Sequence, residues 1–110
     1  MKPALFHPKA RDSIRKFPED VRKAIGKAIL DLQAGHSLTL PLSRPMPSVG
    51  SGVDEIRVKD ASGAYRVFYL CKLARGIVVF HAFVKKTQTT PHREIEIAAK
   101  RLKEMFNEEG

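Results

Sequence analysis

Polar and apolar residues alternate through three neighbouring runs of the sequence, and this pattern constrains the fold more than any other feature. The runs are residues 53–59, 64–73 and 77–84. Such alternation is typical of strands that bury one face, and the second and third runs are also rich in aromatic and β-branched residues. Because short turns separate the runs, the sequence predicts a three-stranded antiparallel meander.

The two turns determine which side chains of the meander face one another. If Lys59 faces Ala64 across the first turn, then Arg57 faces Arg66. If the second turn is a tight hairpin, Arg66 also faces Lys85. Adjacent like charges destabilise a sheet by up to about 1 kcal/mol per pair, so we interpret this cationic row as a site for an anion such as phosphate. The alternative is an open face with three solvated side chains, and a one-residue change in either turn would break the row.

The charge balance favours a polyanionic partner. Lys and Arg number 20 against 12 Asp and Glu, a formal net charge of +8, and 43% of the 110 residues are hydrophobic. This composition predicts one folded domain over residues 1–110, with nucleic acid as the leading class of partner. A membrane partner is not expected, because no apolar run has the length of a spanning helix and the N-terminus has no signal-peptide core. We therefore expect a cytoplasmic protein.

Apolar residues at helical spacing predict three helices around the meander. The predicted segments are residues 7–17, residues 18–35 and a C-terminal helix led by Pro91. Residues 36–52 contain several prolines and glycines without a lasting period, which predicts a surface loop with a functional role. The fold class that follows is α+β, with an antiparallel sheet packed against an N-terminal helical hairpin and a C-terminal helix.

Strict alternation also predicts which residues share each face of the sheet. The face that receives the helical hairpin is expected to carry Tyr65, Val67, Tyr69, Cys71, Val78, Phe80 and Ala82. Val79 and Phe83 are expected on the opposite face, where the C-terminal helix supplies part of the cover. The third strand is therefore predicted to be covered on both sides.

Phosphodiester cleavage without a metal needs cations at the non-bridging oxygens and groups that transfer protons. The cationic row supplies the cations, Lys59 extends it along its strand as a candidate RNA contact, and Lys86 can reach the same site if the strand end twists. Candidates for proton transfer are Glu55, His81 and His92. A carboxylate beside arginines more commonly serves as their counter-ion, and a single histidine is more often structural than catalytic.

Phe68 and Phe83 are predicted to lie beside the cationic row, where they are candidates to stack on an RNA base. The alternative, which the usual burial of aromatic residues favours, is that both fill the core under the C-terminal helix. The 4 histidines show no metal-ligand spacing, and no glycine-rich phosphate loop is present. We therefore expect no metal and no cofactor.

Several segments together resemble phage-derived RelE/HigB-type toxins of bacterial type II toxin-antitoxin systems. The segments are Glu55-Ile-Arg57, Tyr65-Arg-Val-Phe-Tyr69, Phe80-His-Ala-Phe-Val-Lys-Lys-Thr-Gln-Thr-Thr-Pro91 and Glu94-Ile-Glu-Ile-Ala-Ala-Lys-Arg-Leu102. The resemblance runs from about His7 to Leu102 in the same order of elements. It implies a RelE/ParE-like fold and a metal-independent mRNA endonuclease (mRNA interferase) that acts in the ribosomal A site through attack by the 2′-hydroxyl.

The resemblance also assigns expected roles and partners. Arg66 matches the phosphate-contacting arginine of the family, Arg57 matches a basic position on the preceding strand, and Lys85 or Lys86 matches the basic pair that closes the last strand. RelE uses a C-terminal tyrosine that this chain lacks, whereas HigB toxins use histidines. Expected partners are the ribosome, mRNA and a neutralising antitoxin of HigA-like helix-turn-helix type. The alternatives are a ParE-like inhibitor of DNA gyrase and a catalytically inactive RNA-binding or regulatory homologue.

Overall fold

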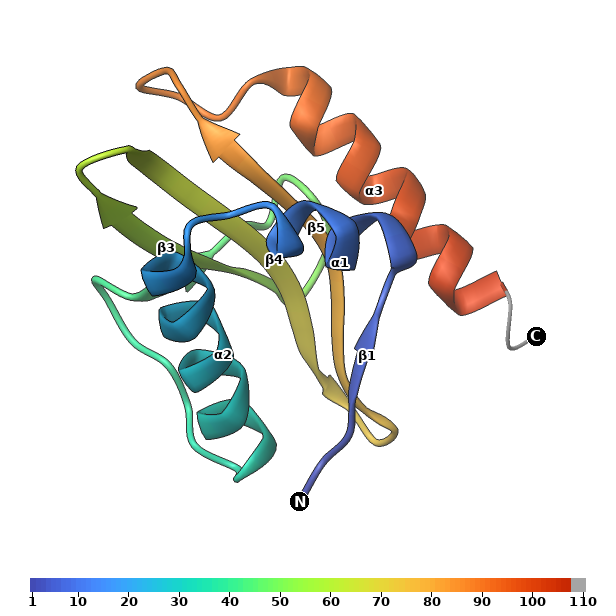
Figure 1. The fold of residues 1–110 in the computed structure, drawn as a ribbon. Coiled ribbons are helices and arrows are strands. Elements are labelled where there is room, and N and C mark those ends of the chain that lie inside the picture. The colour runs from blue at the N-terminus through green and yellow to red at the C-terminus, as the bar shows by residue number, and fades with distance from the viewer. Residues whose placement is uncertain (108–110) are drawn as a thin grey trace.

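A five-stranded mixed sheet forms the centre of the protein in the computed structural model, which describes residues 1–107 (Figure 1). The strands are β1 (Ala4–Phe6), β2 (Ser43–Pro45), β3 (Val53–Asp60), β4 (Gly63–Leu73) and β5 (Gly76–Lys85). Their spatial order is β1-β5-β4-β3-β2. The predicted meander is confirmed, because β3, β4 and β5 pair antiparallel in sequence order. The prediction of a wholly antiparallel sheet is wrong, since β1 pairs parallel with β5.

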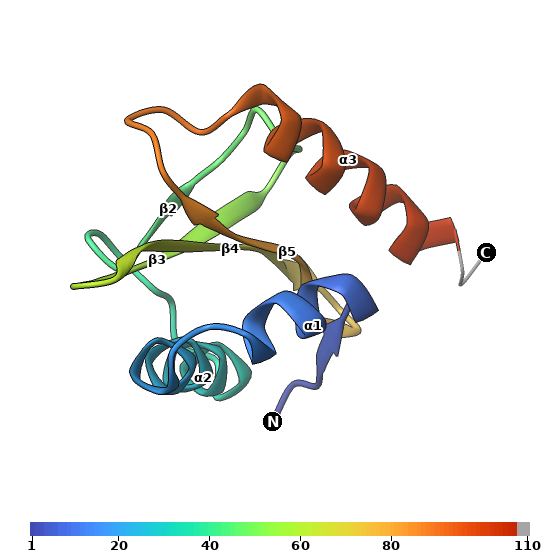
Figure 2. The same ribbon diagram turned by 45° about the horizontal axis from the view of Figure 1, so that its top comes forward.

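Three helices cover the two faces of the sheet. They are α1 (Pro8–Arg15), α2 (Glu19–Gln33) and α3 (His92–Asn107). Figure 2 shows α1 and α2 on one face and α3 on the other. Pro18 precedes α2, and two carboxylates in the first turn of α2 lie at the positive end of its dipole. Gly35 then follows the end of α2 with φ 94°, a conformation that glycine adopts without strain.

Apolar side chains form one core on each side of the sheet. The core under α2 is built from Phe17, Val21, Ile25, Ala28, Ile29, Leu32, Ile56, Tyr65, Val67, Tyr69, Ile77, Val79 and Ala82. The core under α3 is built from Met46, Val49, Val53, Phe68, Leu70, Val78, Phe80, Phe83 and Ala98. Each fully buried aliphatic or phenylalanine side chain contributes about 1.5–3 kcal/mol to folding, so both helical layers are held mainly by burial.

The division of β5 between these cores differs from the prediction. Val78 and Phe80 were expected under the N-terminal helices but lie in the core under α3, whereas Val79 lies in the core under α2. The cause is an irregularity in the β4–β5 pairing, where Phe68 pairs with His81 but Tyr69 pairs with Val79. Phe80 is thereby left out of the ladder. Because β5 has one extra residue at this point, Phe80 and the residues before it face the side of the sheet opposite to the one predicted.

The two short strands have no counterpart in the predicted elements. β1 and β2 contain 3 residues each, too few for a period to be visible in the sequence. β2 lies in the segment predicted as a loop, and Met46 and Val49 from the same segment are buried under α3. The loop is therefore anchored to the sheet at its centre.

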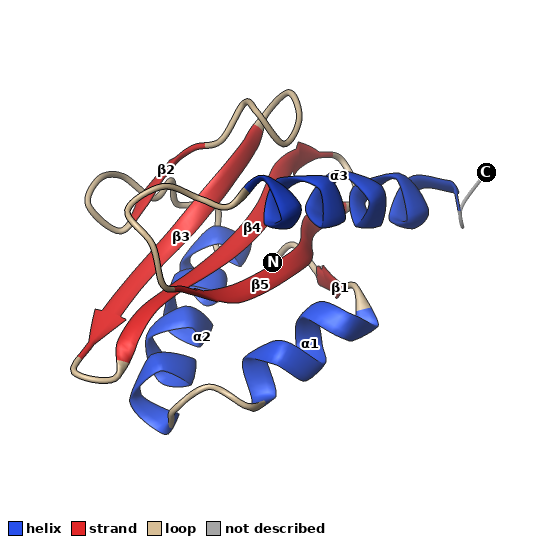
Figure 3. Cartoon of the chain, turned by 90° about the horizontal axis from the view of Figure 1, so that it is seen from above, coloured by secondary structure: helices blue, strands red, loops and turns tan. Residues whose placement is uncertain are grey.

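The α3 helix covers only part of its face of the sheet. Seen from above, α3 crosses β4 and β5, while the end of the sheet at the β3–β4 turn extends beyond the helix (Figure 3). This uncovered end carries the polar part of the meander. Among residues 1–107, no helix has both the length and the apolar character that a membrane span requires.

Candidate functional site

A cationic cleft lies on the uncovered end of the sheet, on the same face as α3. Its volume is about 470 Å³. The lining residues are Arg57, Lys59, Ala64, Arg66, Lys85, Lys86, Thr87 and Gln88. Every ionisable side chain in this lining is a cation, so the cleft presents concentrated positive potential to an incoming anion. β3, β4 and β5 each contribute a part, and the segment that leaves β5 closes one side.

The pairing of the strands confirms half of the predicted row. Arg57 faces Arg66 across β3 and β4, as the first turn predicts. Lys85 does not face Arg66, because Lys85 pairs with Ala64 and Arg66 pairs with Phe83. The predicted register of β5 is thus displaced by two residues, and a displacement of two leaves every side chain near Lys85 on its predicted face. The three cations therefore form a staggered group instead of a lateral row.

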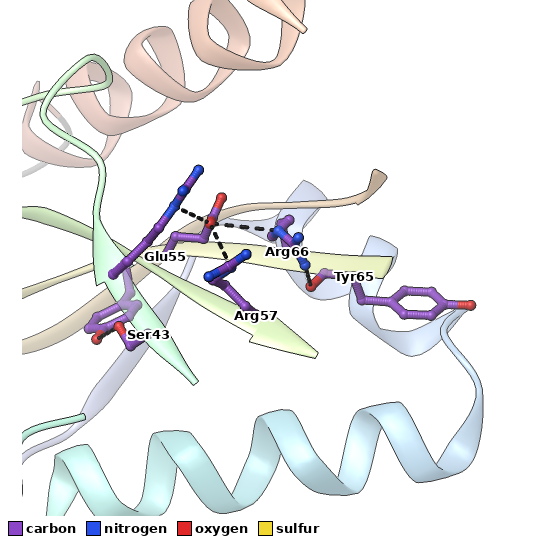
Figure 4. A network of polar contacts seen from close by, with 7 residues as sticks. Ser43, Glu55, Arg57, Tyr65 and Arg66 are labelled. Carbon is purple, nitrogen blue, oxygen red and sulfur yellow. Dashed lines mark hydrogen bonds and ion pairs between the residues drawn. The ribbon is translucent and has the colours of Figure 1, made fainter. Parts of the chain in front are cut away.

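Glu55 lies beneath these cations and is fully buried, with 0% of its side chain exposed. Its Oε1 atom is 3.2 Å from Nε of Arg44, 3.6 Å from Nε of Arg66 and 3.7 Å from Nε of Arg57. Figure 4 shows the carboxylate between the guanidinium groups. We call Glu55, Arg44, Arg57 and Arg66 the Glu55 cluster. This arrangement supports the counter-ion interpretation of Glu55, since one carboxylate partly neutralises three guanidinium groups.

The Glu55 cluster retains excess positive charge that burial makes costly. Burial is the main cause of the lowered pKa of Arg66, with Arg57 and Arg44 lowering it further and Glu55 opposing them. Burial also lowers the pKa of Lys85, with the charge of Arg66 as the next cause. Both lowered pKa values mean that the charged forms of Arg66 and Lys85 are less favourable in the free protein than in water. A bound anion would stabilise these charged forms, so the cluster is suited to hold a phosphate.

Arg44 is a member of the cluster that the sequence analysis did not identify. β2 pairs antiparallel with β3 and places Arg44 opposite Glu55. The neighbouring Ser43 points to the other face, where its hydroxyl forms a 2.7 Å hydrogen bond with the hydroxyl of Tyr69. Burial raises the pKa of Tyr69 to about 12, so the phenol stays protonated and the bond is preserved. A lone arginine among prolines gives no periodic signal by which it could have been found.

A second buried network lies under α3. The Nε2 atom of His81 donates to Oε1 of Glu94 at 2.7 Å, and a guanidinium nitrogen of Arg101 donates to Nδ1 of His81 at 2.8 Å. These bonds fit the neutral imidazole that carries its proton on Nε2. Burial is the main cause of the lowered pKa of His81. We call these three residues the His81 cluster.

The position of His81 does not match its predicted role beside the cleft. Its side chain is 4% exposed, both ring nitrogens have partners, and the ring stacks on Phe83 at 5.3 Å between centroids. His81 is also absent from the residues that line the cationic cleft. The alternation of side chains correctly places His81 on the same face of the sheet as the cations. However, α3 covers the part of that face where His81 lies. In the free protein, His81 therefore joins α3 to β5.

The remaining predicted residues divide between the surface and the core. His92 is 81% exposed and pairs with Glu96 one turn along α3, and it does not line the cleft. Phe68 is 0% exposed and lies in the core under α3, which agrees with the favoured alternative that it fills this core, so it offers no surface for an RNA base in the free protein. Phe83 is 8% exposed and belongs to the same core under α3. Lys59 and Lys86 both reach the cleft.

His7 fixes the other end of α3 and has no part in the cleft. Its Nδ1 accepts from the backbone N–H of Lys9 at the start of α1, and its Nε2 lies 3.1 Å from Oε1 of Glu104. Within residues 1–107, no group of three or more histidine, cysteine or acidic side chains is arranged to hold a metal ion. The cationic cleft offers guanidinium and ammonium groups that can bind an anion.

Comparison with known families assigns the chain to one of them. Residues 12–103 match the model of the phage-derived Gp49-like proteins, a segment that contains α2, β2 to β5, the cationic cleft and most of α3. The chain belongs to the Gp49-like family. No curated protein matches it significantly. In this Gp49-like protein, every residue of the Glu55 cluster lies inside the matched segment.

Proposed function

We propose that this Gp49-like protein is a RelE/HigB-type toxin of a type II toxin-antitoxin system and a metal-independent endonuclease that cleaves mRNA on the ribosome. The observation that carries the proposal is the cleft of about 470 Å³ whose ionisable lining is wholly cationic and which lies over the Glu55 cluster. Membership of the Gp49-like family is compatible with a toxin-type function. The net charge of +8 suits a protein that binds ribosomal and messenger RNA.

The proposed reaction is attack by the ribose 2′-hydroxyl on the adjacent phosphate. The 2′-oxygen forms a bond to phosphorus as its proton passes to solvent water, and the bond from phosphorus to the 5′-oxygen breaks as that oxygen gains a proton. Negative charge develops on the non-bridging oxygens, where Arg66 and Arg57 can each direct two N–H groups. The products are a cyclic phosphate and a free 5′-hydroxyl.

Lys85 is the cleft residue best suited to protonate the leaving 5′-oxygen. Its lowered pKa, which results mainly from burial and then from Arg66, makes its ammonium a stronger acid than that of an ordinary lysine. Lys86 lies next to it in the cleft and is exposed. Glu55 acts in this scheme by positioning the arginines, since its Oε1 is shared among three guanidinium groups.

The proposed system includes an antitoxin of the HigA-like helix-turn-helix type. Positive charge at the cleft would attract acidic residues of this antitoxin. Such a partner would reduce toxicity either by covering the cleft or by keeping the protein off the ribosome. A gene for a helix-turn-helix protein beside the gene of this chain would support the pairing.

Controlled expression in a bacterial host tests the proposal. The wild-type chain should arrest growth and produce messages cut within codons on translating ribosomes, because the cleft positions one phosphate for attack. The double variant Arg57→Gln/Arg66→Gln should grow normally. Mapping of the 5′ ends of cellular RNA measures the cleavage.

A matched control separates the cleft from overall charge. Arg15→Gln/Lys23→Gln also removes two positive charges, but from exposed positions on α1 and α2, and should stay toxic. Growth arrest with DNA damage and intact messages would instead indicate a gyrase inhibitor. Normal growth of cells that contain the folded wild-type protein and no antitoxin would refute the toxin proposal.

A further inference from the structure

A second pocket adjoins the cationic cleft and has a different lining. Its volume is about 390 Å³, and it is lined by Pro41, Leu42, Arg57, Lys59 and Arg66. The last three residues also line the cationic cleft, so the two hollows adjoin one another along these side chains. The ionisable side chains of the cationic cleft are all cations, and the second pocket adds an apolar wall of Pro41 and Leu42.

Hydrogen bonds hold this apolar wall at a fixed position. The backbone carbonyl of Leu42 accepts from the backbone N–H of Arg57 at 2.7 Å, and the N–H of Ser43 donates to the carbonyl of Thr39 at 3.1 Å. The side chain of Leu42 also packs against the core under α2. The wall is therefore tied to the sheet just before β2 and is part of the free protein before any ligand binds.

The lining chemistry indicates what can occupy the pocket. Apolar atoms face three cations, and the lining contains no carboxylate and no amide side chain. A ligand that fits has a flat, weakly polar part beside a negatively charged part. A nucleotide within an RNA strand has this form, because its base has apolar faces and its phosphate lies one sugar away. An apolar peptide would leave the shared cations without a partner.

We propose that the Pro41–Leu42 wall binds one nucleobase of the RNA strand whose phosphate occupies the cationic cleft. This inference rests on the proposed function and adds to it the place of the neighbouring base. The base packs on Pro41 and Leu42, and the planar guanidinium of Arg57 can stack on it from the sheet. Since no side-chain amide or carboxylate lines the pocket, the base is held by packing and the wall discriminates weakly among bases.

Binding to two short oligomers of equal length and charge tests the inference. One is a single-stranded RNA with 2′-O-methyl groups, which cannot be cleaved by 2′-hydroxyl attack, and the other is its abasic analogue. The purified protein should bind the base-containing oligomer about fivefold more tightly, a packing effect below that of an aromatic platform. Leu42→Asn should reduce this preference to near unity, whereas Leu42→Met should keep it because the wall stays apolar.

Two further variants show whether a change in oligomer affinity comes from the Pro41–Leu42 wall or from another part of the protein. Leu30→Asn alters a leucine that is 55% exposed on α2, and it should not change either affinity. Arg66→Gln should weaken binding of both oligomers alike, because the phosphates are common to both. Thermal midpoints of the Leu42 variants identify any loss of folded protein.

Equal affinity of the wild-type protein for the two oligomers, including no binding of either, would overturn the inference. An unchanged preference in folded Leu42→Asn would overturn it as well. In either case the Pro41–Leu42 wall would have to bind another partner, such as the antitoxin. Message cleavage in cells together with equal affinities would refute the base pocket alone, so its failure is distinct from a failure of the proposed function.

Discussion

Two buried polar networks of this protein lie on the same face of one sheet but differ in charge balance. The Glu55 cluster sets one carboxylate against three guanidinium groups. The His81 cluster sets one carboxylate, Glu94, against one guanidinium group and a neutral imidazole. The first opens into the cationic cleft, and the second lies under α3. The first therefore retains the capacity to bind an anion, whereas the second is satisfied internally.

This difference shows how burial and charge separate a ligand site from a structural contact. Buried ion pairs are costly unless their charges and hydrogen bonds are matched. The His81 cluster meets that condition and ties α3 to β5. The Glu55 cluster does not meet it in the free protein, and a positive excess is held there by the surrounding fold. Residues that are kept in such an unfavourable state are candidates for function.

The largest expected difference between the two networks concerns RNA cleavage. Arg66→Ala should reduce cleavage by at least about 100-fold, the usual cost of removing one donor from a developing oxyanion. His81→Gln should leave cleavage nearly unchanged in protein that remains folded, because His81 does not line the cleft. Quantification of cut messages in a translation extract measures both. A loss of cleavage in folded His81→Gln as large as that in Arg66→Ala would make His81 part of the reaction.

Replacement of Glu55 should have the next largest effect, on stability. Glu55→Gln keeps the shape of the side chain but leaves three arginines without a counter-ion, and we expect the free energy of unfolding to fall by about 3–5 kcal/mol. Inorganic phosphate should restore more stability to this variant than to the wild type, because phosphate replaces the missing charge. Thermal melts with and without phosphate measure the effect. A variant that phosphate does not stabilise would argue against anion binding at the cluster.

The His81 cluster should produce a smaller effect that depends on pH. Burial holds the pKa of His81 below its ordinary value of 6.5, in surroundings that include Glu94, Arg101 and His7. As the pH falls through 6.5 the unfolded chain takes up a proton more readily than the folded protein, so the free energy of unfolding should be greatest above pH 6.5 and decline below it.

Urea unfolding at several pH values measures this dependence. The decline should be shallower in His81→Gln, which lacks the titrating group, and unchanged in His92→Gln, which alters an exposed histidine. An equally steep decline in wild type and His81→Gln would show that other groups dominate the acid sensitivity.

The smallest expected effect on stability is at Lys85. Because the charge of Lys85 is opposed by burial and by Arg66, Lys85→Gln should leave the thermal midpoint unchanged or slightly raised. The same variant should reduce the salt dependence of RNA binding by about 0.7 in the slope of log K against log salt, the value for one phosphate contact on a single strand. The matched comparison is Lys59→Gln, which removes the charge of an exposed lysine in the same cleft and is measured in the same two experiments. A clear loss of stability in Lys85→Gln would assign Lys85 a structural role.

Local patterns in the sequence were sufficient for most elements of the fold. Alternation identified the meander, and apolar spacing together with Pro18 and Pro91 identified three helices, because these signals act within a few residues. They were insufficient where structure depends on distant partners. β1 and β2 pair with edges that β5 and β3 offer, and Phe80 leaves the ladder at a register shift that alternation in the sequence does not mark.

The candidate site divides in the same way. The first turn alone places Arg57 opposite Arg66, so that pair could be predicted from the sequence. Arg44 could not, since its contact with Glu55 requires a strand from a distant loop. Phe68 and His81 have the predicted parity but are covered by α3. The alternation along a strand predicts the face of the sheet on which a side chain lies, but only tertiary packing decides whether that face is exposed.

The sequence by itself determined a basic chain with an antiparallel meander, flanking helices and arginines on adjacent strands, because composition, periodicity and turn chemistry are local properties. The tertiary structure decided that Glu55 is buried among three arginines, that α3 covers His81 but leaves Arg57 and Arg66 beside an open cleft, and that Pro41 and Leu42 extend this cleft. The physical reason is that burial and charge balance depend on which distant segments come into contact.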